Sequence, residues 1–279
     1  MRELLKWAIA VLKEQGIESP QLDAEILLAH TLGRLTRSEL YARLDDEPDP
    51  EVEETFRSLV GRRSQHEPVA YITGRKEFYG LDLYVDQRVL IPRPETETLV
   101  EVSLSIARQK DIMRLAEVGV GSGAIAIALA ANLRSTNIFA IDASADALAV
   151  AKLNCQRHGV LDRVRLLRGD LLEPLPEPVQ LIVANLPYVS QEELEGLPPD
   201  IIEYEPLRAI DGGEDGLEHV KRLLAQAPPK LQPHGIICLE IGATQAPAVN
   251  ELAREEFPDA TVGLVRDLAG LDRVAIIAT

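Results

Sequence analysis

Two short turns in the sequence carry groups suited to binding a cofactor and an amide. The first is the glycine-rich stretch Gly119-x-Gly121-x-Gly123, and the second is Asn185-Leu186-Pro187-Tyr188. Glycines let the backbone pass close to a ligand, and the helix expected over 124–131 presents free amides at its first turn. The GxGxG spacing favours S-adenosylmethionine over NAD, and the stretch lacks the GK[ST] ending of a P-loop. Taken alone, GxG also fits a simple tight turn.

Two carboxylates follow the glycines at the ends of further apolar runs. Asp142 closes the run 137–141, about 20 residues beyond the glycines, where an acidic residue can accept both hydroxyls of a ribose. Asp170 follows the run 164–167 and could accept from the amino group of an adenine. A turn or helix cap is an equally good interpretation of Asp170 in isolation. The ordered series of three strand ends favours a nucleoside-containing cofactor.

The second turn has the chemistry to hold a primary amide. An amide nitrogen with two N–H groups needs two acceptors, and the side-chain oxygen of Asn185 and the carbonyl of Leu186 could supply both. Tyr188 could form the wall of this pocket and pack on the reacting group. The alternative is a proline turn with a core tyrosine.

The surrounding pattern predicts an open, mostly parallel sheet that brings the two turns together. Strands expected over 114–118 and 179–184 lead into them, and ligands of such sheets bind beyond the strands' carboxyl ends. Further strands are expected over 137–141, 164–167, 235–241, 260–265 and 273–278, with helices over 144–158, 216–227 and 244–257. We therefore predict an α/β domain with a seven-stranded, doubly wound sheet that ends in an antiparallel hairpin. The polar stretch 187–214 is expected to be a functional loop.

The first third of the chain has a different pattern. Apolar residues at helical spacing predict short helices, including one that Ser19 caps and one that a Thr36-x-x-Glu39 capping box opens. Alternating apolar residues from Arg75 to Ile91 predict a strand ribbon. The expected organisation is a small helical bundle over 1–74, a β-ribbon linker over 75–92 and a Rossmann-like domain over 93–279.

Charge and composition exclude several classes of function. The 279 residues carry a net charge of −16, which disfavours nucleic-acid and acidic-membrane partners. Cys155 and Cys238 lie in apolar patterns without CxxC spacing, as expected of buried thiols in a reducing, cytoplasmic compartment. The histidines are not in metal-ligand spacing, and neither GxSxG nor HExxH is present, so we expect no metal. No apolar run approaches the ~20 residues of a membrane span.

Longer motifs show a family resemblance across nearly the whole chain. Arg93-Pro94-Glu95-Thr96-Glu97 precedes the glycine turn and Asn185-Leu186-Pro187-Tyr188 follows it. The stretches 19–25, 67–74, 90–97 and 266–273 match in order as well. On these residues the chain resembles the bacterial PrmC/HemK family, which are peptide chain release factor glutamine methyltransferases.

The resemblance implies methylation, with S-adenosylmethionine, of the side-chain amide nitrogen (N5) of the glutamine in the Gly-Gly-Gln loop of release factors. It implies that the N-terminal bundle docks the release factor, which is the expected partner of a monomeric enzyme. Asn185, Leu186, Pro187 and Tyr188 would hold the glutamine and form the catalytic site. The cofactor would contact the following residues: Gly119, Val120, Gly121, Ser122, Gly123, Asp142, Asp170, Leu171 and Asn185.

Two positions depart from the family pattern. The usual Asn-Pro-Pro-Tyr is Asn-Leu-Pro-Tyr here, and the usual Asp at the head of the glycine turn is Glu117. The first keeps the backbone carbonyl, and Pro187 still favours an extended Leu186. The second leaves the reaction type unchanged but bears on cofactor affinity. A ribosomal-protein glutamine methyltransferase, an amino-methylating nucleic-acid enzyme and a non-catalytic cofactor-binding protein are the alternatives.

Overall fold

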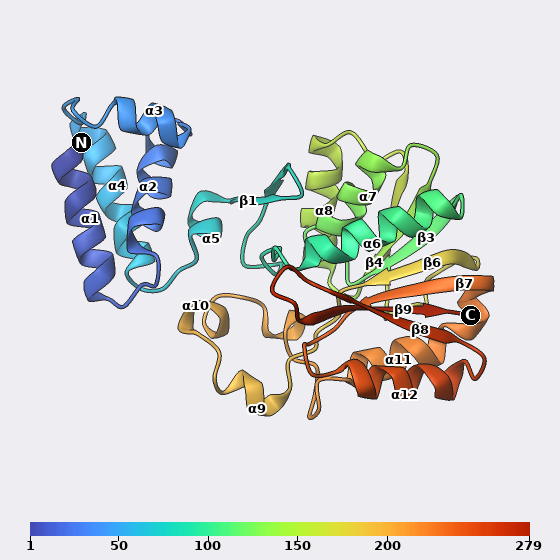
Figure 1. Ribbon diagram of the computed structural model, residues 1–279. Helices are drawn as coiled ribbons and strands as arrows, with labels where there is room; N and C mark the ends of the chain where they lie inside the picture. The colour runs from blue at the N-terminus through green and yellow to red at the C-terminus, as the bar shows by residue number, and fades with distance from the viewer. The chain divides into compact units, whose positions relative to one another are not determined.

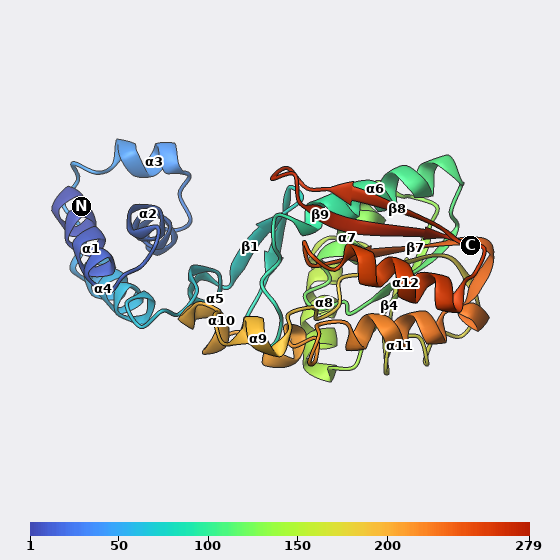
Figure 2. The ribbon, with the colours of Figure 1, turned by 60° about the horizontal axis from the view of Figure 1, so that its bottom comes forward.

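The computed structural model describes residues 1–279, and the chain divides into two compact units (Figure 1, Figure 2). The first unit comprises Met1–Arg75 together with Pro198–Tyr204, and the second comprises Lys76–Leu197 and Glu205–Thr279. No helix is long and apolar enough to cross a membrane.

The first unit is a helical bundle with its own apolar core. Its helices are α1 (Arg2–Glu14), α2 (Pro20–Thr31), α3 (Arg37–Ala42), α4 (Pro50–Arg63), α5 (Val69–Thr73) and α10 (Pro199–Ile202). Leu12, Leu27 and Phe56 are among the fully buried side chains between them. The Thr36 capping box is confirmed. Ser19 occupies the expected N-cap position of α2 and Pro20 begins the helix, but the Ser19 side chain makes no capping hydrogen bond.

A short hairpin opens the second unit. Strands β1 (Arg75–Phe78) and β2 (Leu81–Tyr84) are joined by Tyr79 and Gly80, whose φ angles of 51° and 71° suit a two-residue hairpin turn. The buried side chain of Asn154 anchors the hairpin by bonding the backbone N–H and C=O of Tyr84, both at 2.8 Å. The turn expected at Asp86-Gln87 is present, where the Asp86 side chain accepts the Arg88 amide, but no strand follows it, so the expected ribbon to Ile91 ends at Tyr84.

The main sheet has seven strands in the order β5-β4-β3-β6-β7-β9-β8. The strands are β3 (Arg114–Val118), β4 (Asn137–Asp142), β5 (Val164–Arg168), β6 (Val179–Ala184), β7 (Leu231–Glu240), β8 (Thr261–Arg266) and β9 (Asp272–Ala278). Strands β3 to β7 are parallel to one another, whereas β9 is antiparallel to both β7 and β8. The predicted seven-stranded sheet with a terminal antiparallel hairpin is confirmed.

Helices cover both faces of this sheet (Figure 1). One face packs against α6 (Thr96–Gln109), α7 (Ala124–Asn132) and α8 (Ala145–Arg157), and the other against α11 (Glu218–Gln226) and α12 (Ala246–Glu256). In the register, Val118 at the end of β3 lies beside Ile141 of β4 and Ala184 of β6. The three turns that follow these strands therefore meet at one edge.

The segment expected to be a long loop contains short helical pieces. These are α9 (Gln191–Leu194), α10 and a 3-10 turn at Leu207–Ala209. A capping box at Ser190 and Glu193 opens α9, which explains how so polar a stretch holds a helical turn. The two cysteines are free and buried, as expected.

Candidate cofactor and amide site

A cavity of about 320 Å³ opens at the carboxyl edge of the sheet, where the three turns meet. Of the predicted site residues, it is lined by Gly119, Gly121, Asp142, Asp170, Leu171, Asn185, Leu186 and Pro187. Residues more than 60 positions apart in the sequence thus share one pocket, as the predicted strand order requires.

The glycine turn is held in a shape that glycine alone adopts readily. Gly119, Gly121 and Gly123 all have positive φ. A Cβ on Gly119 would lie 3.2 Å from the Asn185 carbonyl oxygen, so this glycine permits the first turn to touch the second. A Cβ on Gly121 would meet only the Gly119 oxygen at 4.0 Å, and the rest of its surroundings are open cavity. The turn forms a cradle with space for a ligand against its backbone.

Asp142 connects the glycine turn to the start of α8. One of its carboxylate oxygens accepts the Gly121 amide at 2.9 Å and the other accepts the Ser144 amide at 2.8 Å. Each oxygen retains a second lone pair, so the carboxylate can still accept from two hydroxyls. Asp170 pairs with Arg222 through one oxygen, and Leu171 beside it adopts a φ of 48°. These residues fit a nucleoside-bearing group such as S-adenosylmethionine.

Asn185 presents its side-chain oxygen as an acceptor. Its Nδ2 donates to the Thr96 hydroxyl at 3.1 Å, and its Oδ1 accepts no hydrogen bond within the chain. Leu186, the departure from the family pattern, buries its side chain in the core cluster beneath the cavity, so its backbone is fixed by packing. An acceptor pair for an amide is therefore available beside the glycine turn.

Four predicted residues lie outside this cavity. Val120 and Ser122 are buried within the glycine turn, and Gly123 is the N-cap of α7. Tyr188 lines a neighbouring cavity of about 440 Å³ together with Gln245 and Arg273. Its ring follows the Asn185 turn directly but belongs to the adjoining space.

Behind Asn185 and Tyr188 lies a buried acid that was not predicted from the sequence. Glu240, the last residue of β7, is 2% exposed. Burial raises the pKa of its carboxyl to about 7, against opposing effects of Thr96, Arg273 and Tyr188. Burial, together with Glu240, also raises the pKa of Tyr188 to about 12. The sequence pattern that could have identified Glu240 as a candidate site residue is an acidic residue at the end of an otherwise apolar strand.

Other cavity residues were also missed. Arg88, Pro206, Arg208 and His219 line the cavity, and Arg208 donates to the Ser144 hydroxyl at 2.7 Å. Arg88, Pro206 and Arg208 come from segments outside the main helices and strands, and His219 comes from the first turn of α11, so no spacing in the sequence marked them.

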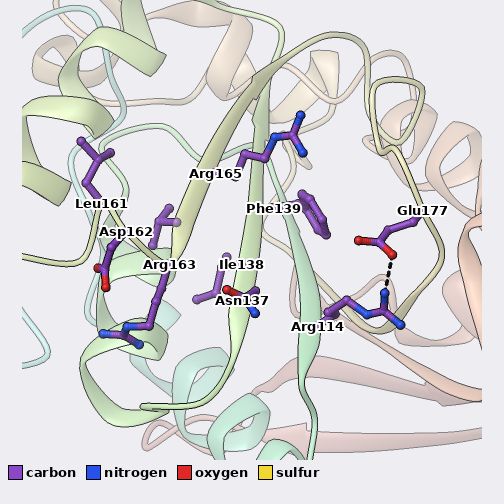
Figure 3. A pocket seen from close by; sticks show the side chains of 10 residues that line it. Arg114, Asn137, Ile138, Phe139, Leu161, Asp162, Arg163, Arg165 and Glu177 are labelled. Carbon is purple, nitrogen blue, oxygen red and sulfur yellow. Dashed lines mark hydrogen bonds and ion pairs between the residues drawn. The ribbon is translucent and has the colours of Figure 1, made fainter.

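A second cavity, of about 450 Å³, lies at the opposite edge, where β3, β4 and β5 begin (Figure 3). Its cations already have partners: Arg114 pairs with Glu177, and Arg163 donates to the carbonyls of Ala130 and Leu133. Arg165 lies over the Phe139 ring at 6.0 Å. Parallel sheets bind ligands at the other end of their strands, so the carboxyl edge is the candidate site.

Two family comparisons cover most of the chain. Residues 3–74 match the family described as the PrmC N-terminal domain, and residues 115–201 match one described as a methyltransferase domain.

Two relatives that match over nearly their full length share one description. The release factor glutamine methyltransferase of Rhodopirellula baltica is 40% identical over 278 residues, which cover 97% of this chain and 93% of the relative. The protein of the same description from Geobacter sulfurreducens is 41% identical over 276 residues, with 98% and 95% covered.

Solved structures share the sheet and its helices. The N-terminal domain of human METTL16 in complex with SAH has a TM-score of 0.51 at 17% identity, covering 71% of this chain and 76% of that one. A ribosomal protein L11 methylase from Lactobacillus delbrueckii subsp. bulgaricus has a TM-score of 0.50 at 22% identity, covering 66% and 79%. This likeness confirms the predicted methyltransferase fold.

Proposed function

Because the chain belongs to the family of release factor glutamine methyltransferases, we propose that it methylates a glutamine of peptide chain release factors. The proposed acceptor is the side-chain amide nitrogen (N5) of the glutamine in the Gly-Gly-Gln loop, and the proposed methyl donor is S-adenosylmethionine. Release factors act in translation, so the proposed location is the cytoplasm.

The observation that carries the proposal is the orientation of the Asn185 side chain. Its Nδ2 is engaged by Thr96, which leaves Oδ1 free as an acceptor, and the next residue, Leu186, lines the same cavity. The Asn185 Oδ1 and the Leu186 carbonyl oxygen match the two N–H groups of a primary amide. The Asn185 backbone also approaches Gly119, so the amide would be held next to the cofactor cradle.

The amide nitrogen of the substrate glutamine is a weak nucleophile, and the residues of the Asn185 turn have to activate it. The nitrogen lone pair of an amide is delocalised into its carbonyl, and acceptors on both N–H groups draw electron density back toward the nitrogen. Bound S-adenosylmethionine supplies a methyl group on a cationic sulfonium. Asn185 and Leu186 hold the amide in the direction of attack, and Pro187 stiffens the turn that carries them.

We expect the residues around the glycine turn to bind the cofactor. Gly119 and Gly121 offer close approach, Asp142 offers acceptors for ribose hydroxyls, and Asp170 with Leu171 offers a contact for adenine. Cofactor and glutamine would then share the cavity at the carboxyl edge of the sheet.

The test is to incubate the purified protein with a full-length release factor and methyl-labelled S-adenosylmethionine, and to locate the label by peptide mass spectrometry. We expect one methyl group on the Gly-Gly-Gln glutamine. We expect Asn185→Ala to lower turnover at least about a hundredfold, because it removes one of the two acceptors.

Asn137→Ala is the matched control. Asn137 is exposed at the opposite edge of the sheet, so the variant should turn over like the wild type. Unchanged activity in Asn185→Ala would contradict the assigned role of Asn185. Label on a ribosomal-protein glutamine, with none on the release factor, would contradict the proposed substrate.

A further inference from the structure

A line of buried polar contacts runs from Asn185 away from the cavity into the sheet. Asn185 Nδ2 donates to the Thr96 hydroxyl at 3.1 Å. The Thr96 hydroxyl also lowers the pKa of the Glu240 carboxyl, one oxygen of which, Oε2, is buried without a hydrogen-bond partner. Thr96 and Glu240 are 4% and 2% exposed, so water does not compete for these contacts. Asn185 is thus backed by a hydroxyl and the hydroxyl by an acid.

We propose that Thr96 and Glu240 are positioning residues that determine which end of the Asn185 side-chain amide faces the substrate. This inference rests on the proposed function, because it assumes that the Asn185 oxygen accepts from a substrate amide. A reversed Asn185 would present an NH₂ group to the N–H groups it has to bind, and two donors cannot pair.

The direction in which the Thr96 hydroxyl donates its single proton determines the orientation of the Asn185 side-chain amide. When Glu240 is ionised, it can only accept, so the Thr96 proton points to it and the Thr96 oxygen is left to accept from Asn185 Nδ2. When Glu240 is protonated, it can donate to Thr96 instead. Thr96 is then free to donate to Asn185, and the reversed amide becomes equally satisfied.

The groups around Glu240 suit a carboxyl that changes charge near neutral pH. Burial raises its pKa to about 7; Thr96 of α6, Arg273 of β9 and Tyr188 after β6 lower it, and the charge of Glu95 raises it. Its Oε1 accepts the Tyr188 hydroxyl at 3.4 Å, and its Oε2 is buried without a hydrogen-bond partner. The carboxylate therefore has Oε2 available to accept the Thr96 hydroxyl proton, while Oε1 accepts from Tyr188.

The first test compares two threonine variants at position 96 with a matched threonine elsewhere. Thr96→Val removes the hydroxyl and should lower kcat at least about tenfold, with the Kd for S-adenosylmethionine within about threefold of wild type. Thr96→Ser restores the hydroxyl and should restore most of the rate. Thr136→Val is the control: Thr136 is 3% exposed and its hydroxyl donates to Ile112 at 2.7 Å, remote from the cavity. A Thr96→Val enzyme as active as Thr136→Val would overturn the proposal.

The second test is the pH profile of kcat. Wild-type kcat should fall as the pH drops through about 7, because the Asn185 amide is no longer held in one orientation once Glu240 is protonated. Glu240→Gln should be slower and should lack this inflexion. His219 is the histidine that lines the cavity, and His219→Asn should keep the inflexion. An inflexion that survives in Glu240→Gln would overturn the role of Glu240.

The third test needs no release factor, so it separates this inference from the proposed function. In protein labelled with ¹⁵N-asparagine, the side-chain NH₂ resonance of Asn185 is identified by its loss in Asn185→Ala. It should shift with pH around the Glu240 transition in the wild type and stay constant in Glu240→Gln and Thr96→Val. A wild-type resonance that does not respond to pH would overturn the proposal. Failure to methylate any release factor would contradict the proposed function alone.

Discussion

Glu117 carries an ionisable group into the core beside the glycine turn. Its side chain is 1% exposed, and burial raises the pKa of its carboxyl well above the usual range. The negative charge of Asp142 adds to this effect, whereas the Ala126 amide opposes it. Glu117 does not line the cofactor cavity, so its longer side chain enters the protein interior instead of the site.

This burial makes the stability of the protein depend on pH. In the unfolded chain the carboxyl titrates near its ordinary pKa of about 4.3. Between that value and the raised native pKa, the folded state binds more protons than the unfolded state, so the free energy of unfolding falls as the pH rises. Glu117→Gln removes the effect, and we expect its stability relative to wild type to increase as the pH rises above about 4.3. Urea unfolding without cofactor measures this difference.

Glu177→Gln serves as the control for this comparison. Glu177 is exposed and pairs with Arg114 at the opposite edge, where an ion pair contributes little. The stability of the Glu177→Gln variant relative to wild type should hardly change over the same pH range. A Glu117→Gln difference that is flat with pH would show that the native carboxyl is ionised.

At the scale of elements, the repeating parts of the chain were predictable and the irregular parts were not. The helix expected over 144–158 is α8, Ala145–Arg157, because Ser144 caps it and its apolar residues recur at helical spacing. The strand expected over 179–184 is β6 with the same bounds. Local pattern is sufficient where an element buries one regular face.

Long-range polar contacts are the part that the sequence could not reveal. Thr96 is hydrogen-bonded to Asn185, which lies 89 positions further along the sequence. Asn154 is hydrogen-bonded to Tyr84 of the hairpin, which lies 70 positions before it. Neither residue differs locally from an ordinary helix side chain, because their partners are brought to them by the sheet. The candidate site was predictable as turns after strands, and its supporting residues were not.

One such contact joins two walls of the cofactor cavity. Glu205 is buried, and its carboxylate accepts the Ile91 amide at 3.0 Å and the Arg93 guanidinium. Residues 88–90 on one side of this contact and Pro206, Arg208 and Ala209 on the other all line the cavity. The acid fixes the spacing of two segments that belong to no sheet and to no α-helix.

Removing this contact should loosen the cavity. We expect Glu205→Ala to raise the Kd for S-adenosylmethionine at least about tenfold, a loss of about 1.4 kcal/mol, because the Ile91 amide and Arg93 lose a buried acceptor. Amide exchange should speed up at 88–93 and 206–209. Titration calorimetry and exchange mass spectrometry provide the two measurements. Glu177→Ala is the control, and an affinity of Glu205→Ala equal to that of Glu177→Ala would exclude the role of Glu205.

At the scale of the molecule, the two units have separate apolar cores. Leu27, Leu28 and Phe56 belong to a cluster formed within the first unit, while two clusters line the faces of the sheet in the second. Every residue that lines the cofactor cavity belongs to the second unit. Cofactor binding should therefore stabilise the second unit and leave the first nearly unaffected.

A pair of fully buried leucines tests this independence in the full-length chain. Leu27 lies in the core of the first unit and Leu129 in that of the second, and truncation to alanine at either site should cost about 2–5 kcal/mol. In calorimetry, Leu27→Ala should lower a transition that S-adenosylmethionine does not move, and Leu129→Ala should lower the one that it raises. Leu27→Ala should keep the wild-type Kd for the cofactor but raise the KM for the release factor, since we propose that the helical unit docks that substrate. A single transition lowered equally by both variants would mean that the units unfold together, and the docking role would then rest on the KM alone.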